Sequence, residues 1–151
     1  RFHRERIAEL LGGDPDALVV VPSRGRHTGA HPLEESVSLV KPALFPFIRP
    51  VRYVGPPGQK IRKEYRPEHF ETNPSAVEGK RIVVLDDLWA SGSSIVSTAG
   101  SILEAGAESV AMIPVARLVH IENPVYVAAD HKYFGWVKEP YDPDSWPRES
   151  V

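Results

Sequence analysis

Two adjacent acids followed by a run of small residues form the segment of this sequence best suited to chemistry. Asp86 and Asp87 come directly after an apolar stretch, and residues 91–94 read Ser-Gly-Ser-Ser. Glycine lets the backbone approach a ligand closely, while serine hydroxyls and the N–H groups of a first helical turn can bind a phosphate. Two carboxylates beside such a turn suit the vicinal hydroxyls of a sugar, or magnesium-bound water. The pattern therefore predicts a site for a phosphorylated sugar.

The acidic pair is open to other interpretations. The two acids could simply end a strand, with Ser93 as the N-cap of the next helix. A Walker B strand also carries acids after four apolar residues, but the accompanying loop G-x-x-x-x-G-K-[ST] is absent from the chain. An aspartyl phosphatase nucleophile requires D-x-D, whereas here the acids are adjacent and Leu88 follows. The last two interpretations are disfavoured, and the first stays open.

A second candidate segment follows another apolar run near the beginning of the chain. Ser23, Arg24, Gly25 and Arg26 combine backbone N–H donors with two cations. These are the groups that bind a pyrophosphate, and they come at the end of an expected strand. On its own, the segment would be an ordinary strand-to-helix turn.

Residues 41–70 form a basic stretch, with seven Lys or Arg against two acids. Prolines and glycines at 54–60 exclude a helix or a central strand there, so we predict a flexible loop. Such a loop could close over a ligand and stabilise the charge of a departing pyrophosphate. A solvated charged loop is the alternative for each of its polar residues, which are Gln59, Lys60, Arg62, Lys63 and Arg66.

Histidines and tryptophans add weaker signals. His27 and His31 are four residues apart, but Gly29 between them argues against a helix and hence against a metal site. Trp89 could lie beside a sugar site, although packing in the core is the favoured interpretation.

The elements that must position these groups alternate along the chain. Continuous apolar runs at 17–21, 81–85 and 110–115 predict strands buried on both faces. Helical spacing and end signals predict helices at 4–11, 32–40, 93–105 and about 123–133. Strands alternating with helices imply an α/β fold, with a parallel β-sheet core and helices on both faces. Both candidate segments then follow the carboxyl ends of strands, where open α/β sheets bind ligands.

Residues 81–105 resemble the signature with which type I phosphoribosyltransferases bind 5-phosphoribosyl 1-pyrophosphate (PRPP). The signature is an apolar strand, two acids and a phosphate turn that leads into a helix. Ser91 and Ser94 stand where the family usually has threonine, so both hydroxyls are kept. The resemblance implies the type I phosphoribosyltransferase fold, with Asp86 and Asp87 at the ribose hydroxyls and holding Mg²⁺ through water. The implied PRPP-binding residues are Ser23, Arg24, Gly25, Asp86, Asp87, Ala90, Ser91, Gly92, Ser93 and Ser94.

The resemblance extends over about residues 17–117 and implies an enzyme. Its reaction would transfer ribose 5-phosphate from PRPP to a nitrogen nucleophile, a nucleobase or related heterocycle, with release of pyrophosphate. Ala90 stands where members that act on 6-oxopurines typically carry an aspartate, which disfavours hypoxanthine and guanine and leaves orotate-type and ComF-like members open. A non-catalytic PRPP-sensing module of the same fold is the alternative. The implied catalytic residues are Asp86, Asp87, Arg24 and Arg26, with Mg²⁺ as cofactor.

Composition sets the class of protein. The chain of 151 residues is 42% hydrophobic and 25% charged, with a net charge of −2, which predicts one globular domain over residues 1–151. It excludes a disordered chain and a strongly basic nucleic-acid binder, and no apolar run reaches the roughly 18 residues of a membrane span. The absence of cysteine excludes disulfides and fits a cytoplasmic protein. We expect small-molecule substrates, leave a homodimer open, and expect that residues preceding Arg1 have been removed.

Overall fold

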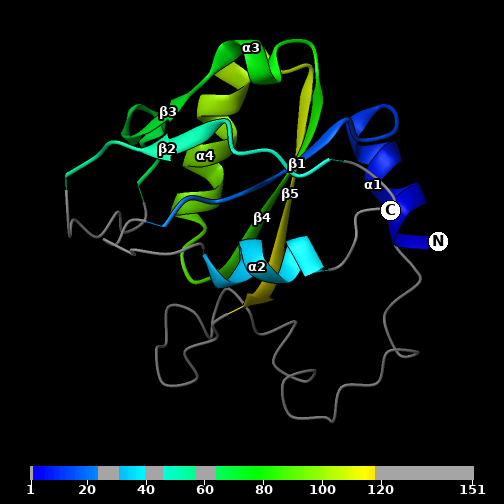
Figure 1. Cartoon of the computed structure of the whole chain (residues 1–151), viewed down its shortest axis with the longest axis horizontal. Coiled ribbons are helices and arrows are strands. Elements are labelled where there is room, and N and C mark those ends of the chain that lie inside the picture. The colour runs from blue at the N-terminus through cyan, green and yellow to red at the C-terminus, as the bar shows by residue number, and fades with distance from the viewer. Residues whose placement is uncertain (1, 24–30, 40–45, 57–63, 118–151) are drawn as a thin grey trace, which may run out of the picture. The chain divides into compact units, whose positions relative to one another are not determined.

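The computed structural model describes residues 2–23, 31–39, 46–56 and 64–117 (Figure 1). Contacts within the chain group Arg1–Arg117 into one compact unit and separate Leu118–Val151, none of which is described. The expected single domain over 1–151 and the expected helix near 123–133 therefore stay predictions. Within the described ranges, no helix combines the length and the apolar character needed to cross a membrane.

Three parallel strands form the main sheet, in the order β1-β4-β5. They are β1 (Ala17–Val20), β4 (Arg81–Trp89) and β5 (Ser109–Arg117). In this register Val20 lies opposite Leu85, and Leu85 lies opposite Ile113. The three expected strands are thus confirmed as a parallel α/β sheet whose carboxyl ends meet at one edge.

Strand β4 is longer than the sequence pattern predicts. Pairing with β5 continues through Leu88 opposite Ala116, after the pairing with β1 has stopped at Leu85. Asp86 and Asp87 therefore lie inside the strand rather than after its end. The apolar run ends at Leu85, so the apolar pattern alone placed the end of the strand too early, whereas pairing with β5 continues it to Trp89.

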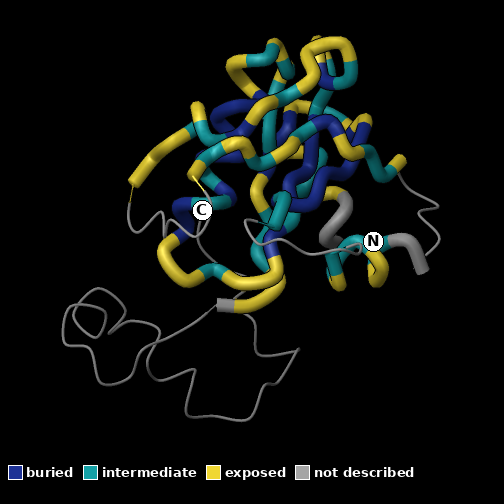
Figure 2. Tube along the Cα trace, turned by 60° about the vertical axis from the view of Figure 1, so that its left-hand side comes forward, coloured by how far each residue is buried: buried dark blue, intermediate teal, exposed yellow. Residues whose placement is uncertain are grey.

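Helices cover both faces of the sheet, as expected (Figure 1). On one face, α4 (Ser93–Glu104) and α3 (Pro74–Val77) bury Ile95, Ile102 and Val77 against β1 and β4. On the other, α1 (Phe2–Leu11) and α2 (Pro32–Leu39) contribute Leu11 and Val37. Alternate strand residues contribute to the two clusters, and buried positions are concentrated in the interior of the described part (Figure 2).

The basic middle of the chain is not a loop throughout. Strands β2 (Val51–Tyr53) and β3 (Phe70–Thr72) pair antiparallel, and the short 3-10 helix η1 (Pro67–His69) precedes β3. Tyr53 packs its ring edge on the buried Phe70, with ring centroids 5.5 Å apart. The prediction of a flexible loop over 41–70 was therefore wrong for residues 51–53 and 67–70. Local composition does not predict pairing between strands that are distant in the sequence. Residues 40–45 and 57–63 lie outside the described part.

Candidate functional site

A tight turn connects β4 to α4 at the carboxyl edge of the sheet. Gly92 adopts a left-handed conformation, with φ of 74°, and accepts a hydrogen bond from the N–H of Val96 at 3.0 Å. The hydroxyls of Ser91 and Ser93 lie 2.9 Å apart, and the Ser93 N–H approaches the Ser91 hydroxyl oxygen at 3.4 Å. The N–H groups of the first turn of α4 have no carbonyl one turn earlier in that helix to pair with. The turn therefore has the form that binds an anion at a helix N-terminus.

Only glycine fits at position 92. A Cβ added there would lie 2.5 Å from Cζ2 of Trp89, and the positive φ is itself unfavourable for other residues. Trp89 is partly buried and packs against the cluster that includes Ile95 and Val84. The core role expected for Trp89 is confirmed. Its ring also lies against the turn at Gly92, a contact that the sequence did not predict.

The two acids of β4 lie in different surroundings. Asp86 is only 9% exposed and already interacts within the protein, whereas the side chain of Asp87 is 61% exposed. Val84 belongs to the cluster under α4, and Leu85 packs with the cluster under α1 and α2. Because successive strand residues point to opposite faces, Asp86 follows the α4 side and Asp87 the α2 side. Of the two carboxylates, Asp87 is the accessible one.

His31 approaches Asp87 from the start of α2. Its Nε2 lies 3.9 Å from Oδ2 of Asp87, and its Nδ1 accepts a hydrogen bond from the N–H of Leu33 at 3.1 Å. The His31 side chain is 18% exposed. The sequence pattern suggested this histidine only as a weak metal partner of His27, which lies outside the described residues. The sequence signal that could have indicated its role is its position just before the helix, where a polar side chain can cap the first turn.

The segment expected to bind pyrophosphate follows the strand next to the acids. The N–H of Val21 donates to the carbonyl of Leu85 at 2.8 Å, which continues the pairing of β1 and β4 beyond Val20. Ser23, two residues later, is half-buried and has an interaction of its own. Arg24, Gly25 and Arg26 lie outside the described residues, so their roles stay predictions. Strand order nevertheless brings the beginning of this segment to the same edge as the acids.

Most of the polar residues expected to contact a ligand from the middle stretch also lie outside the described part: Gln59, Lys60, Arg62 and Lys63. Arg66 is described, and its guanidinium pairs with Glu64 at 2.8 Å and Glu68 at 3.4 Å. These two carboxylates raise the pKa of Arg66 above its usual value, chiefly because its guanidinium donates a hydrogen bond to Glu64. The backbone N–H of Arg66 donates to the hydroxyl of Ser97 on α4 at 2.9 Å. Arg66 thus has a structural role where the segment meets α4.

Magnesium would find oxygen ligands at this edge, since it is commonly held by one or two carboxylates together with substrate phosphates. The exposed carboxylate of Asp87 fits such an ion held through water, whereas Asp86 is buried on the opposite face of β4. Among the described residues, no group of three or more His, Asp or Glu side chains is arranged to hold a metal by itself. A magnesium ion that arrives with its phosphate ligand stays a prediction.

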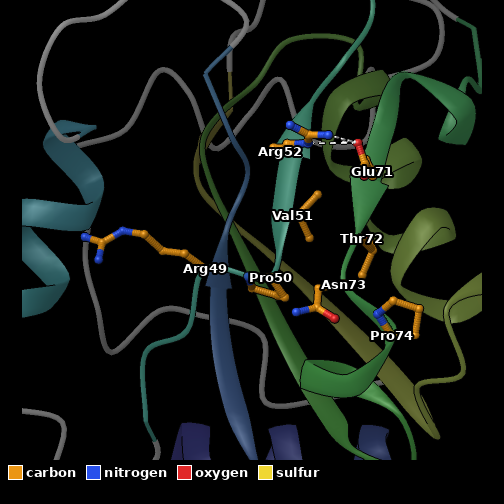
Figure 3. A pocket seen from close by; sticks show the side chains of 8 residues that line it. All are labelled: Arg49, Pro50, Val51, Arg52, Glu71, Thr72, Asn73 and Pro74. Atoms are coloured by element: carbon orange, nitrogen blue, oxygen red, sulfur yellow. Dashed lines mark hydrogen bonds and ion pairs between the residues drawn. The ribbon is translucent and has the colours of Figure 1, made fainter.

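A hollow of about 350 Å³ lies elsewhere, on the β2–β3 pair (Figure 3). Its cations are already used within the protein: Arg52 pairs with Glu71 at 2.8 Å, and Arg49 points away toward Glu34 at 3.0 Å. The hollow therefore offers little charge to a ligand, and the β4–α4 turn remains the candidate site. The hollow on the β2–β3 pair is lined by Arg49, Pro50, Val51, Arg52, Glu71, Thr72, Asn73 and Pro74.

Comparison with known proteins gives one informative relative. The chain is 39% identical over 109 residues to an adenine phosphoribosyltransferase of Alkaliphilus metalliredigens, and the match covers 69% of this chain and 60% of that protein. The chain thus spans less than two thirds of the length of this relative. No protein-family model matches the chain.

Solved structures add weaker likenesses. An adenine phosphoribosyltransferase is 22% identical with a TM-score of 0.49, covering 83% of this chain and 69% of its own. Another, from Thermoanaerobacter pseudethanolicus, is 24% identical with a TM-score of 0.39, covering 78% of this chain and 79% of its own. These TM-scores are too low for us to draw any conclusion from the two structures.

The sequence relative and the site agree with each other. The parallel sheet, the acids in β4 and the turn around Gly92 form the arrangement that the PRPP signature requires. The relative that is 39% identical to this chain is a phosphoribosyltransferase by name. The chain therefore has the type I phosphoribosyltransferase fold and is similar in sequence to an adenine phosphoribosyltransferase.

Proposed function

We propose that this protein transfers the ribose 5-phosphate group of PRPP to a ring nitrogen of a nucleobase and releases pyrophosphate. The observation that carries this proposal is the β4–α4 turn, in which Gly92 opens a helix directly after a strand that holds two acids. The turn offers N–H and hydroxyl donors to a phosphate monoester, and Asp87 is exposed within the same segment. Together these groups recognise the two polar ends of a phosphorylated ribose.

In this reaction the protein stabilises the charges that develop on the substrate and does not supply a nucleophile of its own. The bond from the anomeric carbon to the pyrophosphate oxygen breaks ahead of the bond that forms to the base nitrogen, so positive charge develops on the ribose ring. The base nitrogen then loses its proton to water. The proposed roles are ribose binding for Asp86 and Asp87, and charge neutralisation on the leaving pyrophosphate for Arg24 and Arg26. The 5-phosphate would be bound by Ala90, Ser91, Gly92, Ser93 and Ser94.

Magnesium, when bound, would neutralise part of the pyrophosphate charge and so make it a better leaving group. We propose that Asp86 and Asp87 hold this ion through water. Asp87, with its side chain 61% exposed, is the better placed of the two for an outer-sphere contact.

The acceptor is proposed to be a purine or related base, with adenine as the first to test. The relative at 39% identity is named for adenine, and this chain has Ala90 in place of the aspartate typical of members that act on 6-oxopurines. We therefore expect faster turnover with adenine than with hypoxanthine or guanine.

Binding of PRPP tests the site directly. The double variant Asp86→Asn/Asp87→Asn should bind PRPP at least about tenfold more weakly in the presence of Mg²⁺, because charge-assisted hydrogen bonds to the ribose hydroxyls are lost. Titration calorimetry measures this affinity. Glu71→Gln/Glu78→Gln is the matched control, because it removes the same charge from exposed acids outside the candidate site. Equal affinity of the acidic-pair variant and the wild type would contradict the assigned site.

A PRPP-sensing module of the same fold is the second candidate function, and turnover separates the two. Release of pyrophosphate that depends on both PRPP and a base supports the enzyme. Binding of PRPP without release, across a panel of adenine, hypoxanthine, guanine and orotate, supports the sensor instead. A thermal shift with PRPP but none with ATP would support both over a general nucleotide-binding domain.

A further inference from the structure

The position of His31 is set by the packing of α2. Val37 packs against the cluster of Leu18 and Val83, and Glu34 of the same helix accepts a hydrogen bond from Nε of Arg49 at 3.0 Å. These two contacts hold the helix against the sheet and against the segment beside β1. His31, immediately before the helix, is therefore carried to the carboxyl edge of β4 by the fold rather than by a loop of its own.

The hydrogen bonding of the ring shows which nitrogen carries its proton. Nδ1 of His31 accepts from the N–H of Leu33 at 3.1 Å, so the ring proton belongs on Nε2. Nε2 in turn faces Oδ2 of Asp87 at 3.9 Å. This distance is too long for a direct hydrogen bond, but it is compatible with one oxygen atom bound between the two groups.

We propose that His31 and Asp87 hold one sugar hydroxyl between them, which makes His31 a ligand-binding residue of the site. This inference rests on the proposed function. The hydroxyl donates its hydrogen to the Asp87 carboxylate and accepts one from Nε2–H of His31.

A hydroxyl is the group that this pair of side chains selects. An ionised carboxylate only accepts hydrogen bonds, and Nε2–H only donates, whereas a hydroxyl does both. A phosphate oxygen would meet the negative charge of Asp87, and an ammonium group would have no acceptor in Nε2–H. The pair therefore distinguishes a ribose from its deoxy analogues, in addition to what the phosphate turn recognises.

Two substitutions of His31 separate its two hydrogen bonds. His31→Asn keeps a short acceptor able to cap α2, but it cannot reach Asp87. His31→Gln can place an amide N–H near the position of Nε2, but it gives up the acceptor of the cap. The ligands are ribose 5-phosphate and its 2-deoxy and 3-deoxy analogues, titrated by calorimetry into the full chain.

The expected result is a change in discrimination, not only in affinity. The wild type should prefer ribose 5-phosphate over one of the deoxy analogues by about tenfold, the value of one charge-assisted hydrogen bond. His31→Asn should reduce that preference at least about threefold, and His31→Gln should retain most of it. His31→Asn combined with Asp87→Asn should bring the ratio close to one.

An unchanged ratio in His31→Asn would overturn the inference, even if its affinity for every ligand fell equally, because a purely structural histidine would have that effect. Failure of the proposed function gives a different result. In that case the wild type would bind neither PRPP nor ribose 5-phosphate, and both proposals would fall together. If the wild type binds PRPP and the acidic-pair variant does not, an unchanged ratio removes the role of His31 alone.

Discussion

Acids lie at the two ends of strand β4 in opposite situations, and the one at the amino end comes from the residue before β1. At the amino end, Oδ2 of Asp16 accepts the backbone N–H of Arg81 at 2.8 Å and its Nε at 3.2 Å. At the carboxyl end, Asp87 is 61% exposed and approaches Nε2 of His31 only at 3.9 Å. The same strand thus begins at a carboxylate held by short protein contacts and ends at one held loosely.

The difference separates structure from function along a single strand. Asp16 has a pKa below its usual value, chiefly because its ionised form accepts the backbone N–H of Arg81, and then because it pairs with the guanidinium. Its hydrogen-bonding capacity is directed to the protein. Asp87 lies at the edge where parallel sheets bind ligands, and its exposed carboxylate is the group that we propose binds a sugar hydroxyl. An acid at the amino edge therefore stabilises the fold, while one at the carboxyl edge is available for binding.

The largest effect is expected at the turn that follows the carboxyl end. Gly92→Ala should destabilise the fold by about 2 kcal/mol and weaken PRPP binding strongly. Alanine would have to adopt an unfavourable positive φ at this position, and its Cβ would meet the ring of Trp89. Gly79→Ala is the control, because Gly79 has φ of 65° but nothing within 4 Å of an added Cβ. Chemical denaturation and calorimetry measure both. Equal losses in the two variants would show that the contact with Trp89 is unimportant.

A smaller effect is expected at the amino end. Asp16→Asn should lower Tm by roughly 2–4 °C, because it weakens the charge-assisted contacts to Arg81 at an exposed position. Affinity for PRPP should stay unchanged, since Arg81 and Asp16 lie at the opposite end of β4 from the turn. Thermal unfolding and calorimetry on the same samples check this. A loss of PRPP affinity in this variant would break the division between the two ends.

The same pair predicts a pH dependence. The ionised form of Asp16 is favoured in the folded protein, so its pKa there is lower than the usual 3.8. Its contribution to stability is present above that usual value and is lost as the pH falls through the lower folded-state pKa. The difference in Tm between the wild type and Asp16→Asn should therefore shrink on acidification below about pH 4. A difference that grows in acid would reverse the assignment.

The smallest effect is expected at the ion pair between β2 and β3. Glu71→Gln removes the partner of Arg52, but both side chains are more than half exposed, at 55% and 73%. Surface pairs of this kind contribute little, so Tm should change by about 1 °C or less. Thermal unfolding at low and high salt measures it. A larger change at low salt would show that this edge of the molecule depends on charge more than its exposure suggests.

Local sequence patterns identified much of the framework. The helix expected at residues 93–105 was confirmed as α4, which ends at Glu104 before the left-handed Gly106. The strands at 17–21 and 110–115 appeared as β1 and β5. These elements are predictable because a strand buried on both faces is continuously apolar, and a helix with one buried face repeats every three to four residues.

Pairs of residues distant in the sequence were not predictable in the same way. The pairing of β2 with β3 joins Tyr53 to Phe70, and the contact of His31 with Asp87 spans two elements. Neither leaves a periodic signal, because each depends on how separate elements pack. The extension of β4 through Asp86 and Asp87 likewise depended on its pairing with β5.

The sequence by itself determined which groups the segment offers: two acids, a glycine and serines, which are the types of group that we propose bind a phosphorylated sugar. Only the tertiary structure decided which of these groups a ligand can reach. It buried Asp86, left Asp87 exposed, and brought His31 to it from another helix. The reason is physical. Residue type sets what a side chain can bind, whereas its burial and its distance from other groups depend on how strands and helices that are distant in the sequence pack together.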